Sequence, residues 1–174
     1  QEVESIALQE FSGFHKALTE NGVSVYLNSN ERFFEAPDAL FPNNWFSTHC
    51  ATESSPNTST LFLFPMKALA RRAERREHIV SELRKRYDRV IDLSYFEYQG
   101  VGSYLEGTGS LVIDRVNKVA YCLISQRANQ DVFEVWCEHA GYKPVAFHAY
   151  DSKGRYVYMS TANTNRKCNL PHQC

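Results

Sequence analysis

Three short segments of the chain combine side chains that can bind a planar, charged group. In the first, PDALFPNNWFSTH at residues 37–49, Asn43 and Asn44 follow a proline. Their side-chain amides offer both hydrogen-bond donors and acceptors, which suit a guanidinium or a carboxylate. An Asx-type turn that leads into a strand explains the same residues without any ligand. Both interpretations stay open at this segment.

The second segment places an acid beside two glycines. In LEGTGSLV at residues 105–112, Glu106 precedes Gly107 and Gly109 at the start of an apolar stretch. Because glycines let a ligand or another backbone approach closely, we expect Glu106 to project toward a cationic substrate. The alternative is a glycine-rich turn with an exposed acid. A phosphate-binding loop is excluded because the segment has no Lys and no helix is expected after it.

The third segment is SQR at residues 125–127, between an expected strand and an expected helix. Arg127 can clamp a substrate carboxylate through two parallel hydrogen bonds. A solvated surface arginine is the alternative. Three of the histidines, His15, His78 and His139, fall on expected helices without metal-ligand spacing, so we predict no metal site.

Apolar periodicity predicts the elements that position these segments. The expected helices are 5–21, 68–87 and 129–140, and the expected strands are 23–27, 45–49, 60–64, 89–93, 110–114, 119–124, 143–148 and 155–160. The order strand, strand, helix, strand occurs twice, so this α/β unit predicts a stacked or radial assembly. The Arg- and Glu-rich run of the second helix is expected to be a solvated face with i,i+4 ion pairs.

Composition favours a single soluble domain, which we place at residues 1–160, followed by an irregular tail at 161–174. The 174 residues are 43% hydrophobic and carry a net charge of −1, with no sign of a nucleic-acid or membrane partner. Five irregularly spaced cysteines predict reduced thiols in a cytoplasmic protein, with Cys122 and Cys137 in the core. The chain starts at Gln1 without an initiator Met, so we expect a fragment.

Taken together, FPNNWFSTH at 41–49, LEGTGSLV at 105–112 and SQR at 125–127 resemble the guanidine-modifying (pentein) superfamily. They are similar to amidinotransferase-like hydrolases related to dimethylarginine dimethylaminohydrolase. Residues 65–72 and 74–76 add to this resemblance, which covers roughly residues 1–158. The resemblance implies a five-bladed α/β propeller of ββαβ modules, of which we expect about three of five in this chain.

The resemblance also implies a mechanism that needs no cofactor or metal. A cysteine thiolate attacks the guanidine carbon, and a histidine protonates the departing amine and then activates water. By position, Glu106 is the catalytic carboxylate that orients this histidine, and Arg127 contacts the substrate carboxylate. Asn44 takes the guanidine-binding position, and Asn43 and Gly107 complete the predicted substrate-binding set.

The chain departs from the family pattern at the catalytic residues. Met159-Ser160-Thr161 stands where the family usually has His-Thr-Asn, and Cys168 and Cys174 lack the context of the nucleophile. We therefore expect a poor catalyst or none. The leading hypothesis is a truncated or divergent hydrolase acting on the guanidine of arginine or a methylarginine. The alternatives are a binding or regulatory remnant and an unrelated α/β repeat scaffold. A partial propeller leaves faces uncovered, which predicts low stability or a homo-oligomer.

Overall fold

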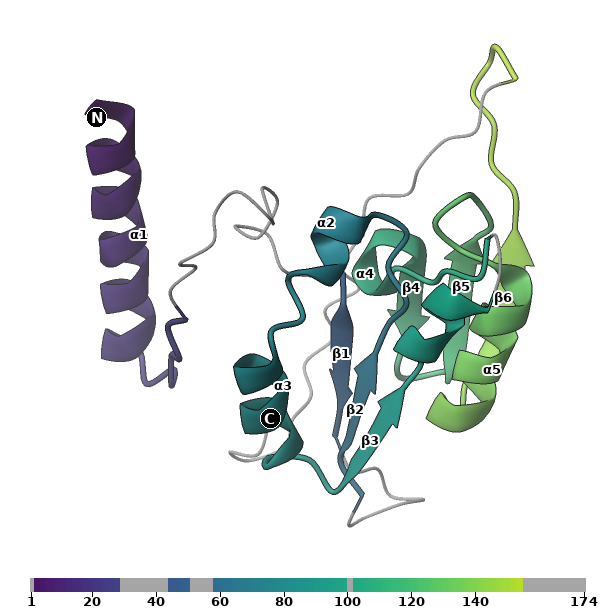
Figure 1. Ribbon diagram of the computed structural model, residues 1–174, viewed down its shortest axis with the longest axis horizontal. Coiled ribbons are helices and arrows are strands. Elements are labelled where there is room, and N and C mark those ends of the chain that lie inside the picture. The colour runs from purple at the N-terminus through teal and green to yellow at the C-terminus, as the bar shows by residue number, and fades with distance from the viewer. Residues whose placement is uncertain (1, 29–43, 51–57, 100–101, 155–174) are drawn as a thin grey trace. The chain divides into compact units, whose positions relative to one another are not determined.

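The computed structural model describes residues 2–28, 44–50, 58–99 and 102–154, and the chain divides into two compact units, Gln1–Glu31 and Arg32–Cys174 (Figure 1). The first unit holds the predicted N-terminal helix, α1 (Glu2–Glu20), which is followed by Gly22 in the left-handed conformation. The strand predicted at 23–27 is wrong, since this stretch is irregular. The described part of this unit offers no second strand to receive its backbone hydrogen bonds.

The second unit contains two three-stranded sheets with the same topology (Figure 1). In each sheet the first two strands are antiparallel and the third runs parallel to the second. The first sheet is β1 (Phe46–His49), β2 (Thr60–Leu63) and β3 (Arg89–Asp92), and the second is β4 (Leu111–Asp114), β5 (Val119–Leu123) and β6 (Lys143–Phe147). The predicted mixed α/β repeat is therefore present twice. The predicted strand at 155–160 and Asn43 lie outside the described residues.

Helices connect the second and third strand of each sheet. In the second sheet this helix is α5 (Gln130–Ala140), whose first turn is capped by the Asn129 side chain accepting from the backbone N–H of Val132. Gly141, with a φ of 70°, ends the helix as predicted. Two short elements, the 3-10 helix η1 (Ser94–Tyr98) and α4 (Gly107–Ser110), link the first module to the second.

The helix predicted at 68–87 is two helices, α2 (Leu69–Arg72) and α3 (Glu77–Arg84). The interpretation of its charge run as a solvated face holds for α3, where Glu82 and Lys85 form an exposed ion pair, but it is wrong around the break between the two helices. Glu74 is only 4% exposed, and the side chain of Arg75 is only 12% exposed. These residues lie at the break between the helices, where Arg75 reaches across to Glu97 of η1. The Arg75 side chain is therefore ion-paired with Glu97 and not exposed to solvent as predicted.

Strand β2 has both of its faces buried by different partners. Leu61 and Leu63 join a cluster with Val80 of α3, whereas Phe62 belongs to a larger core that includes Trp136 of α5. Rings of Phe62 and Trp136 meet edge to face with centroids 5.8 Å apart. The first sheet therefore relies on the second module to cover one face, as expected for a unit that cannot bury both faces alone.

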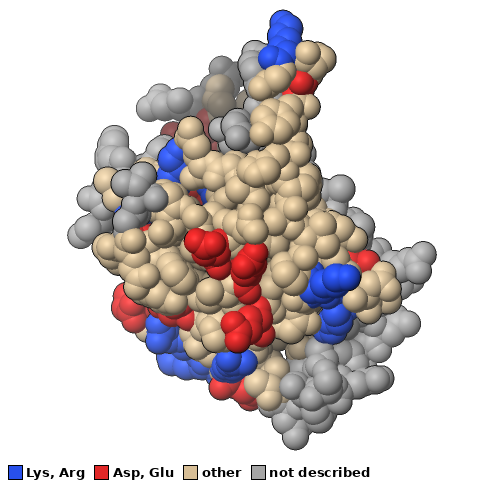
Figure 2. Space-filling view, turned by 90° about the vertical axis from the view of Figure 1, so that its right-hand side faces the viewer, with Lys and Arg blue, Asp and Glu red and all other residues tan. Residues whose placement is uncertain are grey.

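Two cysteines are core residues, as predicted. Cys122 and Cys137 are buried free thiols, and burial raises the pKa of each to about 12. The expectation of reduced thiols therefore holds for Cys122 and Cys137 but not for Cys50, which is disulfide-bonded. None of the described helices is long and apolar enough to cross a membrane. The face drawn in Figure 2 carries acidic and basic side chains in small groups among uncharged residues. A cytoplasmic location stays a prediction.

Candidate functional site

Glu106 stands at the junction between the two modules, immediately before the short helix α4. Its side chain is 3% exposed, so the alternative of a turn with an exposed acid is wrong. The backbone fixes it from both neighbouring segments. The N–H of Glu106 donates to the carbonyl of Arg127, and the N–H of Leu105 donates to the carbonyl of Pro65. A buried carboxylate needs such partners, because desolvation of an uncompensated charge is costly.

Both carboxylate oxygens of Glu106 accept hydrogen bonds. Oε1 accepts from the backbone N–H of Lys67 at 3.0 Å, and Oε2 is 2.5 Å from Nη2 of Arg127. Nε of Arg127 donates to the same Oε2. These three N–H groups, one from Lys67 and two from Arg127, therefore set the orientation of the carboxylate, and Arg127 also balances its charge.

Asn44 lies beside this carboxylate segment, just before β1, and is 5% exposed. Its side-chain carbonyl accepts a hydrogen bond from the hydroxyl of Thr108 in α4. A Cβ on Gly107 would lie 2.6 Å from the backbone oxygen of Asn44. A Cβ on Gly109 would lie 2.8 Å from both Nδ2 of Asn44 and Nη2 of Arg127. Gly107 is thus required by the close approach of the Asn44 backbone, whereas a side chain at Gly109 would have to displace the ends of the Asn44 and Arg127 side chains.

The structure brings together four of the five predicted site residues, namely Glu106, Asn44, Gly107 and Arg127. They come from three separate segments of the sequence, and the fifth, Asn43, lies outside the described residues. Arg127 is half-buried and ion-paired with Glu106, so it is not simply a solvated surface residue. Its predicted contact with a substrate carboxylate, and the predicted role of Glu106 toward a histidine, stay predictions.

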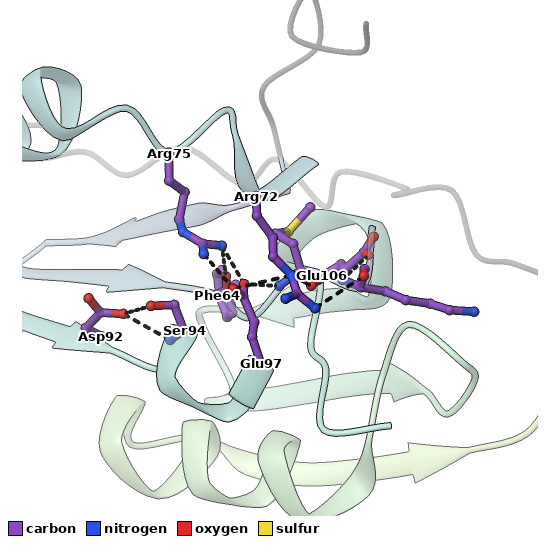
Figure 3. A network of polar contacts seen from close by, with 9 residues as sticks. Phe64, Arg72, Arg75, Asp92, Ser94, Glu97 and Glu106 are labelled. Atoms are coloured by element: carbon purple, nitrogen blue, oxygen red, sulfur yellow. Dashed lines mark hydrogen bonds and ion pairs between the residues drawn. The ribbon is translucent and has the colours of Figure 1, made fainter. Parts of the chain in front are cut away.

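The sequence alone did not point to three residues of this region. Lys67 provides the backbone donor to Glu106, and the Lys67 ammonium contacts the side-chain oxygen of Gln126. Arg72 donates from Nε to the carbonyl of Met66 at 2.8 Å. Glu97 anchors the same stretch of backbone, as Figure 3 shows. No local pattern marks Glu97, because its contacts with Met66 and Arg75 span 31 and 22 residues of sequence.

His49 lies on β1 and is buried against aromatic rings. Its ring centroid is 5.2 Å from that of Phe62 and 5.9 Å from that of Trp136. Burial, and then the positive charges of Arg115 and Lys118, lower the pKa of His49 from 6.5 to about 3. We therefore interpret His49 as a structural residue that packs among aromatic rings.

Arg115 and Ser47 define the protonation of the His49 ring. Nη1 of Arg115 is 3.5 Å from Nδ1, and Oγ of Ser47 is 3.0 Å from Nε2. A guanidinium can only donate, so Nδ1 accepts and Nε2 carries the proton that is donated to Ser47. The lone pair of Nδ1 therefore faces the Arg115 guanidinium and is not available to take up a proton.

Comparisons with known proteins agree on the fold. A model of the family described as "N,N dimethylarginine dimethylhydrolase, eukaryotic" matches residues 1–164. A solved structure with a similar fold is the N-terminal domain of ArgZ, an arginine dihydrolase of the ornithine–ammonia cycle in cyanobacteria, in a mutant form bound to substrate. It superimposes with a TM-score of 0.61 at 14% identity, covering 87% of this chain and 49% of that one. The chain thus spans about half the length of that structure. No curated protein matches the chain.

Proposed function

Because the chain belongs to the eukaryotic dimethylarginine dimethylhydrolase family of the pentein superfamily, we propose that it binds the guanidino group of arginine or a methylarginine around Glu106. The reaction class is hydrolysis of a guanidine carbon–nitrogen bond. The observation that carries the proposal is the buried Glu106 carboxylate, 3% exposed, with Asn44, Gly107 and Gly109 beside it. The Glu106 carboxylate already accepts from the planar guanidinium of Arg127, and the Asn44 amide lies beside it, so the segment has the chemistry to bind a flat cation.

Binding is the first test. Isothermal titration calorimetry of the 174-residue chain should show heat with arginine and methylarginines and little with lysine, which has the charge but no planar fork. Glu106→Gln should weaken arginine binding by about tenfold or more, because a charge-assisted hydrogen bond is lost.

The control for Glu106→Gln is Glu74→Gln, which removes another buried acid, 4% exposed, that is paired with Arg71. Equal affinity for lysine and arginine would contradict the proposal. So would an equal loss of affinity in the two glutamine variants, because it would mean that any buried acid of the fold matters as much as Glu106.

Turnover is a separate test, and it decides between the two functions. The sequence carries Met159 where the family usually has a catalytic histidine, so we infer that a binding or regulatory remnant is the alternative to a hydrolase. A colorimetric assay for citrulline from arginine or methylarginine distinguishes them. A rate of citrulline release that rises in proportion to the protein concentration, and is lost in Glu106→Gln, would exclude the binding or regulatory remnant. Arginine binding without citrulline would exclude the hydrolase for this chain.

We further propose that the two observed ββαβ modules are part of a propeller, of which about three of five modules lie in this chain. The shared topology of the two sheets and the dependence of β2 on its neighbour module support this. Association into a homo-oligomer would then cover open module faces. Sedimentation equilibrium tests this point: a monomer with a cooperative melt at ordinary temperature would contradict it.

A further inference from the structure

We propose that Arg75 and Glu97 are positioning residues that set the orientation of Glu106 through the backbone of residues 64–67. Only the use made of Glu106 rests on the proposed function. The positioning itself rests on contacts between side chains and backbone, drawn in Figure 3. None of these contacts involves a ligand, so the inference can be tested on the chain alone.

The first step is a buried fork between Arg75 and Glu97. Nη1 of Arg75 donates to Oε1 of Glu97 at 2.6 Å, and Nη2 donates to Oε2 at 2.8 Å. The Glu97 side chain is fully buried, with 0% exposure. Both oxygens are thus occupied in a planar, two-pronged arrangement, which fixes direction as well as distance.

In the second step, Glu97 and Arg75 form hydrogen bonds with the backbone that follows β2. Oε1 of Glu97 accepts from the N–H of Met66 at 2.7 Å, and Nη1 of Arg75 donates to the carbonyl of Phe64 at 3.1 Å. Arg72 adds a donor to the carbonyl of Met66. The side chains of Arg72, Arg75 and Glu97 therefore hold polar backbone groups that would otherwise be unpaired in this irregular stretch.

In the third step, the same stretch of backbone forms hydrogen bonds with Glu106 and with its neighbour Leu105. The carbonyl of Pro65 accepts from the N–H of Leu105, and the N–H of Lys67 donates to Oε1 of Glu106. The first contact fixes the chain next to Glu106, and the second fixes its carboxylate. A shift of residues 64–67 would therefore displace or turn the carboxylate itself.

Glu97 is itself held in place independently of Glu106. The Asp92 carboxylate accepts from the N–H and the hydroxyl of Ser94 at the start of η1. The N–H of Leu93 donates to the carbonyl of Leu63, which attaches η1 to the end of β2. Buried ion pairs often add little net stability compared with apolar residues of similar size. A network that ends on Glu106 is better explained by the orientation it imposes.

The test follows the amide of Lys67 in the full chain by two-dimensional NMR and hydrogen exchange. Arg75→Lys keeps the charge but replaces the planar, two-pronged donor by a single ammonium nitrogen, which cannot reproduce the two parallel hydrogen bonds to Glu97. We expect exchange of the Lys67 amide to accelerate by about tenfold or more, while amides within β2 keep their rates.

The matched control is Arg71→Lys, which alters the neighbouring buried pair between Arg71 and Glu74. It should leave the Lys67 amide as in the wild type. If Arg75→Lys lowers the melting temperature but leaves the Lys67 resonance and its exchange unchanged, the residue is merely structural and the inference is overturned. The same holds if both variants change that amide equally.

A measurement on the wild type covers the case in which Arg75→Lys does not fold. Native-state exchange in low denaturant should show the Met66 and Lys67 amides opening in one event, since one network holds both. Separate opening would overturn the inference. Arginine binding adds an independent readout. If the Lys67 amide responds but the wild type binds no arginine, the proposed function fails and the positioning stands.

Discussion

The buried histidine of β1 gives a quantitative prediction about acid stability. His49 has its pKa lowered from 6.5 to about 3, first by burial and then by the charges of Arg115 and Lys118. The folded state therefore disfavours the protonated ring. The stability linked to His49 is fully present above the unfolded pKa of 6.5, and it is lost as the pH falls toward 3.

The size of this effect follows from the shift. One pKa unit corresponds to about 1.4 kcal/mol, so the free energy of unfolding should fall by roughly 2 kcal/mol from neutral pH to about pH 5. The full shift corresponds to roughly 5 kcal/mol. Because His49 is only 8% exposed, solvent screening reduces this little. The effect is large against the total stability of a typical domain.

Urea unfolding at a series of pH values measures it. His49→Phe keeps an aromatic ring against Phe62 and Trp136 but cannot titrate, so the urea midpoint should depend less on pH between about 7 and 5. His78→Gln, on the exposed face of α3, is the control and should keep the wild-type slope. A wild-type pH slope in His49→Phe would refute the reasoning. So would a His49 ring that titrates near 6.5 by NMR.

Three further predictions concern stability and reactivity. Gly107→Ala should lower the free energy of unfolding by about 1–3 kcal/mol, because its Cβ would lie 2.6 Å from the Asn44 carbonyl oxygen; urea unfolding checks this. Cys122 and Cys137, with pKa values raised to about 12, should resist iodoacetamide in the native state and react in urea, as peptide mass mapping would show. Asn129→Ala should cost about 1 kcal/mol through loss of the α5 cap, whereas Asn129→Asp should not; thermal melts that rank the two equally would contradict the cap.

Local patterns in the sequence were sufficient for the order of the strands β1 to β6 and for the helix α5 in the second unit. Alternating and helical apolar spacing depends on neighbours along the chain, so strands such as β2 and β5 were predicted to within a residue at either end. Gly141 marked the end of α5 for a similar reason, since a left-handed residue is favoured at that position. The family resemblance also followed from motifs that are contiguous in sequence.

Other features depended on contacts between distant residues. The helix predicted at 68–87 is broken where Arg75 turns toward Glu97, a partner 22 residues later, which no helical periodicity can reveal. The strand predicted at 23–27 failed because a strand also needs a neighbour to bond with. Its own residue types favour extended structure, but that preference alone is weak.

The sequence by itself determined which residue types could form a guanidine-binding site: an acid with two glycines, an Asn pair and an arginine. Only the tertiary structure decided that Glu106 is buried and bonded to Arg127, a contact that spans 21 residues. The same structure decided that residues 64–67 meet it from another module. The physical reason is that burial and pairing of a charge are set by what the fold places around it, whereas a sequence segment specifies only what is available to be placed.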